Sequence, residues 1–288
     1  MRTGNFVVRL AEYVSRAVPL NLKKYFYRSP MVSSLIRNGL NRNVPEGMVQ
    51  VPIAAGPNEG LEMLLNLKLE KDYWLGTYEA DLQAMVDKLI EPDKVIYDIG
   101  ANIGFFTLMF AKKTGKSGHV FAFEALPENV ERLRKNVEIN GYMDRVSIMN
   151  AAVQDRSGEV DFLIGPSPAM GKVDRSAGRV IDHAQKIMVE GISIDDFTDN
   201  LGNPRPDIVK VDIEGGEVLA FPGMAKTLNL ARPLVMVELH GPESSSVCWD
   251  ELRRLDYRIC RMEPGLPQVY NLEDLDWKSY IIAFPNEE

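Results

Sequence analysis

From residue 95 onward, short apolar runs alternate with segments of helical periodicity. The runs that predict strands lie at 95–98, 119–124, 146–153, 207–212, 234–240, 257–262 and 279–284. Helices are predicted between them at 105–113, 127–140, 217–228 and 248–255. Pro127 at the first helical position and Gly141 after the last one mark the second helix. This alternation indicates an α/β fold with a mostly parallel sheet covered by helices on both faces.

The first 90 residues follow a less regular pattern. Residues 45–60 are rich in Pro and Gly and predict a connection with a short strand at 48–53, followed by an extended segment at 61–69. Residues 78–90 have helical spacing. Near the N-terminus, apolar positions recur at helical spacing while arginines recur every seven residues on another face. We therefore expect a basic, mainly helical extension at 1–70 and one domain at 71–288.

One stretch breaks the alternation. Residues 165–179 have no apolar period and contain many turn-forming residues, and long loops in compact domains are usually functional or disordered. Lys172, Arg175 and Arg179 in this loop could meet an anionic or sugar-phosphate group, although such side chains are more often simply solvated. A strand is predicted next at 186–192, and Ser193 is a suitable N-cap for a helix at 194–198.

Charge and cysteine content narrow the functional classes. The chain of 288 residues has a formal charge of −8, but residues 1–48 carry eight Lys and Arg against two Glu, a net +6, which leaves −14 for the rest. An acidic body argues against nucleic-acid binding. The basic helix fits packing on the domain or on a second subunit better than a membrane surface. A cytoplasmic protein is favoured for three reasons. The two cysteines lack the spacing of a metal site, and the sequence shows neither a signal-peptide core nor an apolar run long enough to span a membrane.

The turn after the first strand of the sheet predicts a cofactor site. It runs from Asp98 to Gly104, and Asn102 stands where a dinucleotide fingerprint needs its middle glycine. The turn also lacks the lysine of a phosphate loop, so it suits phosphate poorly and disfavours NAD. Asp98 at the end of a strand favours an ammonium or sulfonium group, and Glu124 has the spacing of an acid that binds ribose. S-adenosylmethionine meets these conditions, whereas a turn that only connects two elements is the plain alternative.

A second group of polar residues follows the fourth and fifth predicted strands. VKVDIEGGE places Asp212, Glu214 and Glu217 at and beyond one strand end, and VELHGP places Glu238 and His240 at the next. A carboxylate or an imidazole there could remove the proton of an acceptor hydroxyl, and the unperturbed pKa of histidine suits a base near neutral pH. The same side chains could instead hold a divalent ion, which is not favoured, or form structural ion pairs.

The chain resembles the FkbM family of S-adenosylmethionine-dependent methyltransferases. The resemblance rests on VIYDIGANIGFFTLMFA, FAFEALPENVERLRKNVEIN, NAAVQDRSGEV, SIDDF, DIVKVDIEGGEVLAFPGM and PLVMVELH, which appear in this order over residues 74–262. It implies a Rossmann-like class I methyltransferase fold, with a doubly wound, mostly parallel seven-stranded sheet that ends in an antiparallel hairpin.

The resemblance also implies roles for individual residues. The positions expected to bind S-adenosylmethionine are Asp98, Gly100, Ala101, Asn102, Gly104, Glu124, Ala125, Ala152, Val153 and Asp212, with Glu124 on the ribose and Ala152 and Val153 near the adenine. Asn150 or Gln154 could meet the adenine amino group. The catalytic candidates are Asp212, Glu214, Glu238 and His240, and no metal ligand is assigned.

The expected activity is O-methylation of a hydroxyl on a sugar, glycan or related metabolite. A non-catalytic binding or scaffold protein with the same fold is one alternative, and an N-methyltransferase is another. Retention of the donor-site residues argues against the first, and the acidic body argues against RNA as a substrate. The acceptor, the oligomeric state and the identity of the general base stay open.

Overall fold

The computed structural model describes residues 13, 44–165, 171–178, 185–276 and 279–286. The chain divides into two compact units, Met1–Leu89 with Glu138–Gly141, and Ile90–Val137 with Tyr142–Glu288. The predicted basic helix lies outside the described residues, apart from Tyr13. The domain boundary expected after residue 70 remains a prediction. None of the helices in the described ranges is long and apolar enough to cross a membrane.

The described part of the first unit is built on a β-hairpin. Strands β1 (Met48–Pro52) and β2 (Glu62–Asn66) pair antiparallel, with Met48 opposite Asn66. Two helices follow, α4 (Lys71–Trp74) and α5 (Ala80–Leu89). The predicted short strand, extended segment and helix are thereby confirmed. The hairpin buries alternate residues of β2, Met63 and Leu65, as a strand with one covered face should.

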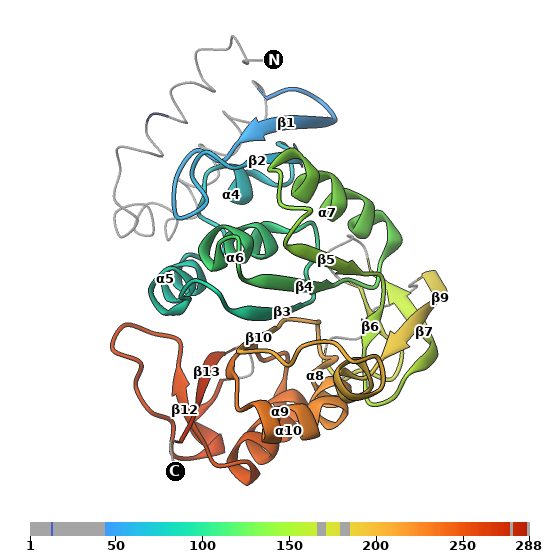
Figure 1. Cartoon of the computed structure of the whole chain (residues 1–288), viewed down its shortest axis with the longest axis vertical. Coiled ribbons are helices and arrows are strands. Elements are labelled where there is room, and N and C mark those ends of the chain that lie inside the picture. Colours follow the sequence, from blue (N-terminus) through green and yellow to red (C-terminus); the bar gives the residue numbers. More distant parts are fainter. Residues whose placement is uncertain (1–12, 14–43, 166–170, 179–184, 277–278, 287–288) are drawn as a thin grey trace. The chain divides into compact units, whose positions relative to one another are not determined.

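The second unit contains the predicted seven-stranded sheet, in the order β12-β13-β11-β10-β3-β4-β5 (Figure 1). Its strands are β3 (Val95–Ile99), β4 (His119–Phe123), β5 (Val146–Met149), β10 (Ile208–Val211), β11 (Leu234–Glu238), β12 (Tyr257–Arg261) and β13 (Tyr280–Pro285). The five strands from β11 to β5 are parallel, and β13 is antiparallel to both of its neighbours. The sheet therefore has the class I methyltransferase arrangement, and its order reverses between β3 and β10.

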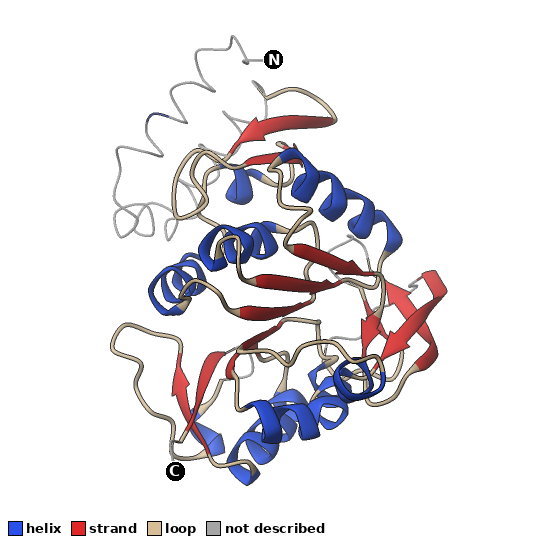
Figure 2. Cartoon of the chain, in the orientation of Figure 1, coloured by secondary structure: helices blue, strands red, loops and turns tan. Residues whose placement is uncertain are grey.

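Helices cover this sheet on both faces (Figure 2). They are α6 (Phe105–Thr114), α7 (Pro127–Ile139), α8 (Glu217–Ala220), α9 (Ala225–Ala231) and α10 (Pro242–Arg254). Tyr97 packs in one core with Phe221 and Leu252 from the α8–α10 side. Its neighbour Asp98 points to the opposite face, where Thr107 of α6 donates a hydrogen bond to it.

Two predicted helices have different bounds in the structure. The segment predicted as one helix at 217–228 consists of α8, a 3₁₀ turn η3 (Pro222–Met224) and α9. Pro222 interrupts it, because proline lacks the backbone N–H that a continuous helix requires. Helix α10 starts at Pro242, six residues before the predicted start at 248.

A second, four-stranded sheet stands apart from the main one, at the right of Figure 2. Its order is β6-β9-β7-β8, with β6 (Ala152–Val153), β7 (Gly158–Ile164), β8 (Lys172–Val173) and β9 (Gln185–Ile192). The single strand predicted at 146–153 is wrong, because its two halves belong to different sheets. Between them Asn150 donates side-chain hydrogen bonds to the backbone carbonyls of Glu124 and Ala125 at 3.1 and 3.0 Å.

Strand β7 was not predicted from the sequence, although its pattern is readable. Val160 and Phe162 are buried while Glu159 and Asp161 are exposed, which is the alternation of a strand with one covered face. Strand β9 confirms the prediction at 186–192. Ser193 acts as the predicted cap, because the backbone N–H of Asp196 donates to its Oγ at 3.1 Å.

Candidate active site

The two polar clusters of the sequence lie at one edge of the main sheet. Strand β10 pairs in parallel with both β3 and β11, so the ends of these strands are adjacent. The turn after β3 is fixed between its neighbours: the backbone N–H groups of Gly100 and Ala101 donate to Phe123 O at 3.0 and 2.9 Å, and Asp212 N donates to Ile99 O at 3.1 Å. Carboxyl ends of parallel strands are where open α/β sheets bind ligands.

The glycines of this turn allow a close approach of neighbouring elements. Gly100, Asn102 and Gly104 all have positive φ, at 79°, 50° and 94°. A Cβ atom on Gly100 would lie 1.8 Å from the carbonyl oxygen of Asp212, and one on Gly104 would lie 2.6 Å from Leu133 Cδ1. Position 100 therefore requires glycine for conformation and for space, and position 104 favours glycine for its conformation.

Glu124 is held rigidly at the end of β4. Its Oε2 accepts a hydrogen bond from Asn102 N at 2.9 Å, and its Oε1 accepts from Leu126 N at 2.9 Å and from Asn129 Nδ2 at 3.3 Å. Burial raises the pKa of Glu124, and these hydrogen bonds oppose the rise. The carboxylate is 8% exposed and directly adjoins the glycine turn. Its contact with a ribose remains a prediction.

Asp98 forms a buried ion pair that the sequence interpretation missed. Lys210 Nζ lies 3.3 Å from Asp98 Oδ1 and 3.6 Å from Asp212 Oδ2, and it donates a hydrogen bond to Gly100 O at 2.9 Å. Asp98 is fully buried and Lys210 is 3% exposed. The sequence did contain a signal for this ion pair, namely a lysine inside a buried apolar strand, because a buried charge requires a partner of opposite charge. In this arrangement Lys210 balances the charge of Asp98, and contact of Asp98 with a ligand remains a prediction.

The residues expected near adenine differ in the hydrogen-bonding groups that they could present to a ligand. The side chains of Ala152 and Val153 are buried in two different cores, with Ala125 beside Ala152. Gln154 is engaged at both ends of its amide, by Gly158 O and by Arg175. Asn150 is exposed, and in the described part of the chain its carbonyl oxygen accepts no hydrogen bond. Asn150 is thus the better candidate for an adenine amino group.

The acidic residues beyond β10 and β11 surround His240. Its Nε2 lies 3.7 Å from Glu238 Oε1, 3.9 Å from Asp212 Oδ1 and 4.0 Å from Glu214 Oε2. Its Nδ1 lies 3.1 Å from Glu217 Oε1. All four catalytic candidates therefore meet at one point of the rim, with Glu217 behind the imidazole.

Glu217 orients the imidazole ring. It is fully buried, accepts a hydrogen bond from Ser244 Oγ at 2.7 Å, and accepts weaker ones from the backbone N–H groups of Ile213 and Gly215 at 3.3 and 3.4 Å. A carboxylate so fixed holds the proton on Nδ1 and turns Nε2 toward the other acids. The sequence left structural ion pairs of these acids open, and the structure pairs Glu217 with His240.

The environment changes the protonation of His240. Burial alone would lower its pKa, but the hydrogen bond and charge of Glu217, together with Asp212 and Glu238, outweigh burial and raise the pKa from 6.5 to about 9. The imidazole is therefore mostly protonated at neutral pH. This corrects the expectation of an unperturbed base, since a protonated imidazole cannot accept a proton.

Three of these side chains could hold a metal ion. Asp212, Glu238 and His240 each offer a ligand atom, and these atoms lie within 4.8 Å of one another. Oxygen and imidazole ligands suit several divalent ions, and a carboxylate behind the histidine is common at metal sites. A metal would have to displace the Nε2 proton that the raised pKa retains. The cluster thus permits a metal without requiring one.

A segment of the second sheet reaches this rim. Lys172 is buried and donates hydrogen bonds to Ala177 O at 2.7 Å and Ser176 O at 3.5 Å. Burial lowers the pKa of Lys172, against the charges of Glu214 and other acids. Ala177 N in turn donates to Gly215 O at 3.0 Å. Ala177 of the predicted loop therefore lies beside the turn that carries Glu214.

Comparison with known proteins agrees with this arrangement. The model of the FkbM methyltransferase domain matches residues 98–259, which include the glycine turn, Glu124 and the acid–histidine cluster. The chain belongs to the FkbM methyltransferase family. The family predicted from the sequence motifs is thereby confirmed.

Two curated proteins and one solved structure are similar to this chain. The hexuronic acid methyltransferase AglP of Haloferax volcanii is 28% identical over 56% of this chain and 62% of its own length. The 2-O-methyltransferase NoeI of Sinorhizobium fredii is 30% identical over 51% of this chain and 64% of its own. The chain thus spans less than two thirds of either relative. An FkbM methyltransferase from Methylobacillus flagellatus is 14% identical with a TM-score of 0.44, covering 75% of this chain and 55% of that one.

Proposed function

We propose that this protein transfers a methyl group from S-adenosylmethionine to a hydroxyl of a sugar or glycan. The observation that carries the proposal is the acid–histidine cluster directly beside the glycine turn, where Asp212 O and Gly100 are in contact. The names of the two curated relatives, a hexuronic acid methyltransferase and a 2-O-methyltransferase, support a sugar hydroxyl as the acceptor.

The hydrogen bonds of the glycine turn fit S-adenosylmethionine better than a dinucleotide. A pyrophosphate needs free backbone N–H groups. Here the N–H groups of Gly100 and Ala101 are bonded to Phe123 O, and that of Asn102 is bonded to Glu124. The donor would be held by this turn, by Glu124 and by Asn150. It supplies a methyl group already activated on a sulfonium, so the protein has to orient the acceptor and take up its proton.

Asp212 is the proposed proton acceptor. Its side chain is 19% exposed, and within the described residues no hydrogen bond reaches its carboxylate; Lys210 and His240 stand 3.6 and 3.9 Å away. A carboxylate in this position can take the hydroxyl proton as the new C–O bond forms. Protonated His240 would stabilise the negative charge that develops on the acceptor oxygen. Glu214 and Glu238 would accept hydrogen bonds from neighbouring sugar hydroxyls.

The first test is calorimetric titration with S-adenosylhomocysteine and, separately, with NAD. We expect micromolar binding of S-adenosylhomocysteine and none of NAD. Glu124→Gln should weaken the binding, because a neutral amide is a poorer acceptor for ribose hydroxyls. Glu128→Gln removes an exposed acid nearby and should leave binding unchanged. Preference for NAD, or equal binding by both variants, would refute the proposed donor site.

Transfer of a labelled methyl group to a panel of neutral and acidic sugars then tests the reaction itself. Donor binding without transfer to any hydroxyl or amine acceptor would instead favour the binding-protein alternative. Transfer to amines alone would favour the N-methyltransferase.

A further inference from the structure

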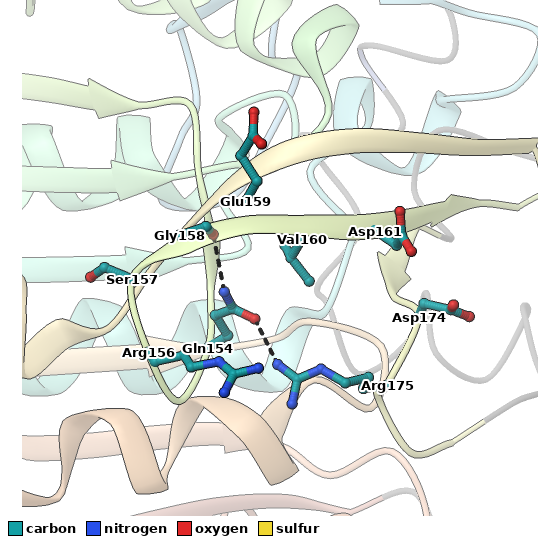
Figure 3. A pocket seen from close by; sticks show the side chains of 9 residues that line it. All are labelled: Gln154, Arg156, Ser157, Gly158, Glu159, Val160, Asp161, Asp174 and Arg175. Carbon is teal, nitrogen blue, oxygen red and sulfur yellow. Dashed lines mark hydrogen bonds between the residues drawn. The ribbon is translucent and has the colours of Figure 1, made fainter.

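The second sheet carries a pocket that the reaction centre does not use. It has a volume of about 230 Å³ and lies between the turn that joins β6 to β7 and the residues after β8 (Figure 3). Seven of its nine lining residues have polar or charged side chains. The side chains that matter for its chemistry are Gln154, Arg156, Arg175, Asp161 and Asp174.

Two arginines converge at one end of the pocket. Figure 3 shows the side chains of Arg156 and Arg175 extending toward one another beside Gln154. Arg175 Nη2 donates to Gln154 Oε1 and to Asp155 Oδ1, both at 3.1 Å. Within the described ranges Arg156 makes no hydrogen bond or ion pair. Asp155 is thus bonded to Arg175 alone, and the positive charge and hydrogen-bond donors of Arg156 are left over for a ligand.

The two aspartates of the pocket pair with a different cation. Asp161 and Asp174 are both bonded to Lys186 Nζ, at 3.2 and 2.8 Å. Glu159 points away from the arginines in Figure 3. The arginine end is therefore the part of the pocket that attracts an anion. Planar guanidinium groups bind carboxylate and phosphate in pairs of parallel hydrogen bonds, so both anions match the donors present.

Arg175 is held in place and lies on a segment that leads to the rim of the main sheet. Gln154, which is 2% exposed, holds Arg175 by its buried amide. Two residues farther along, Ala177 N is bonded to Gly215 O beside the acid–histidine cluster. Two extended residues span at most roughly 7 Å. One short segment therefore adjoins both the pocket and the reaction centre.

We propose that this pocket binds a carboxylate or phosphate group of the methyl acceptor, at a distance from the hydroxyl that is methylated. The inference rests on the proposed function for the identity of the acceptor, and it deepens that function by assigning Arg156 and Arg175 to acceptor recognition. It predicts a preference for uronic acids or sugar phosphates over neutral sugars.

Direct binding tests the pocket independently of the donor site. Glucuronate, glucose 1-phosphate and glucose would each be titrated into the protein and followed by NMR. We expect at least one of the two anions to bind and glucose to bind far more weakly. Arg156→Gln should weaken anion binding about tenfold or more, because it removes a charged hydrogen bond. The relative affinity of the two anions identifies which group the pocket takes.

Arg134→Gln is the matched control, since it removes an exposed arginine on α7 that does not line the pocket. Equal binding of glucose and the anions, or equal weakening by both variants, would overturn the proposal. Binding of S-adenosylhomocysteine is measured on the same samples, so a failed donor site is distinguished from a failed anion pocket. With an anionic acceptor in hand, Arg156→Gln should raise KM and leave kcat nearly unchanged.

Discussion

Replacing Glu217 with Gln tests the electrostatic account of the rim. The substitution keeps the shape of the side chain and removes the buried charge that holds the proton on His240. In the wild-type protein the pKa of His240 is raised from 6.5 to about 9. Burial lowers the pKa of His240, and without the charge of Glu217 mainly Asp212 and Glu238 would oppose this lowering. We therefore expect the pKa of His240 to fall toward 6.5 or below.

The expected change in the free energy of unfolding follows from the size of this pKa shift. A raised histidine pKa stabilises the folded state fully below pH 6.5, and the stabilisation is lost as the pH rises to about 9. At 1.36 kcal/mol per unit this amounts to about 3 kcal/mol in the free energy of unfolding. The destabilisation caused by Glu217→Gln should therefore be large at pH 6 and shrink by about that amount near pH 9.5.

Two measurements check this prediction. NMR titration of the ring nitrogens reports the pKa directly, and His240→Asn assigns the signal among the three histidines. Urea unfolding at several pH values reports the free energy. Glu243→Gln, which removes an exposed acid in the first turn of α10, is the control and should show neither effect. A wild-type His240 that titrates near 6.5, or a destabilisation by Glu217→Gln that does not vary with pH, would refute the reasoning.

The remaining predictions concern the turn, the buried ion pair and the reaction. Gly100→Ala should abolish donor binding and lower the melting temperature more than Gly141→Ala, because both have positive φ but only the Cβ at 100 meets a backbone atom, at 1.8 Å. Lys210→Met should destabilise the fold by about 3–5 kcal/mol in chemical unfolding, and adding Asp98→Asn should restore part of this loss. Asp212→Asn should lower kcat by roughly 10²–10⁴-fold with nearly unchanged affinity for S-adenosylhomocysteine, as measured by steady-state kinetics and calorimetry. Treatment with EDTA should leave methyl transfer unchanged; loss of activity that Mg²⁺ or Mn²⁺ restores would show that the acid–histidine cluster holds a metal.

Much of the fold was predictable because its signals are local. Apolar runs long enough for buried strands alternate with helical periods, and this alone implies a parallel sheet. Since the ends of parallel strands share an edge, the order of strands and helices along the chain was enough to place Asp98, Asp212 and His240 on one rim. The predictions of single elements were wrong where tertiary contacts or a proline favoured a different structure from the local apolar pattern. Asn150 ends one strand by bonding to the chain after β4, and Pro222 breaks a helix whose apolar period continues past it.

The sequence by itself determined the family, the main sheet, the glycine turn and the set of acids and histidine at its rim. The tertiary structure alone decided how these groups are charged and paired. Lys210 meets Asp98 only through the register of β10 against β3, and His240 meets Glu217 across 23 residues of sequence. The pKa of His240 depends on burial and on distances to carboxylates from separate elements, which no pattern along the chain encodes. The arginine pocket likewise exists only because the second sheet folds residues 154–156 against residue 175.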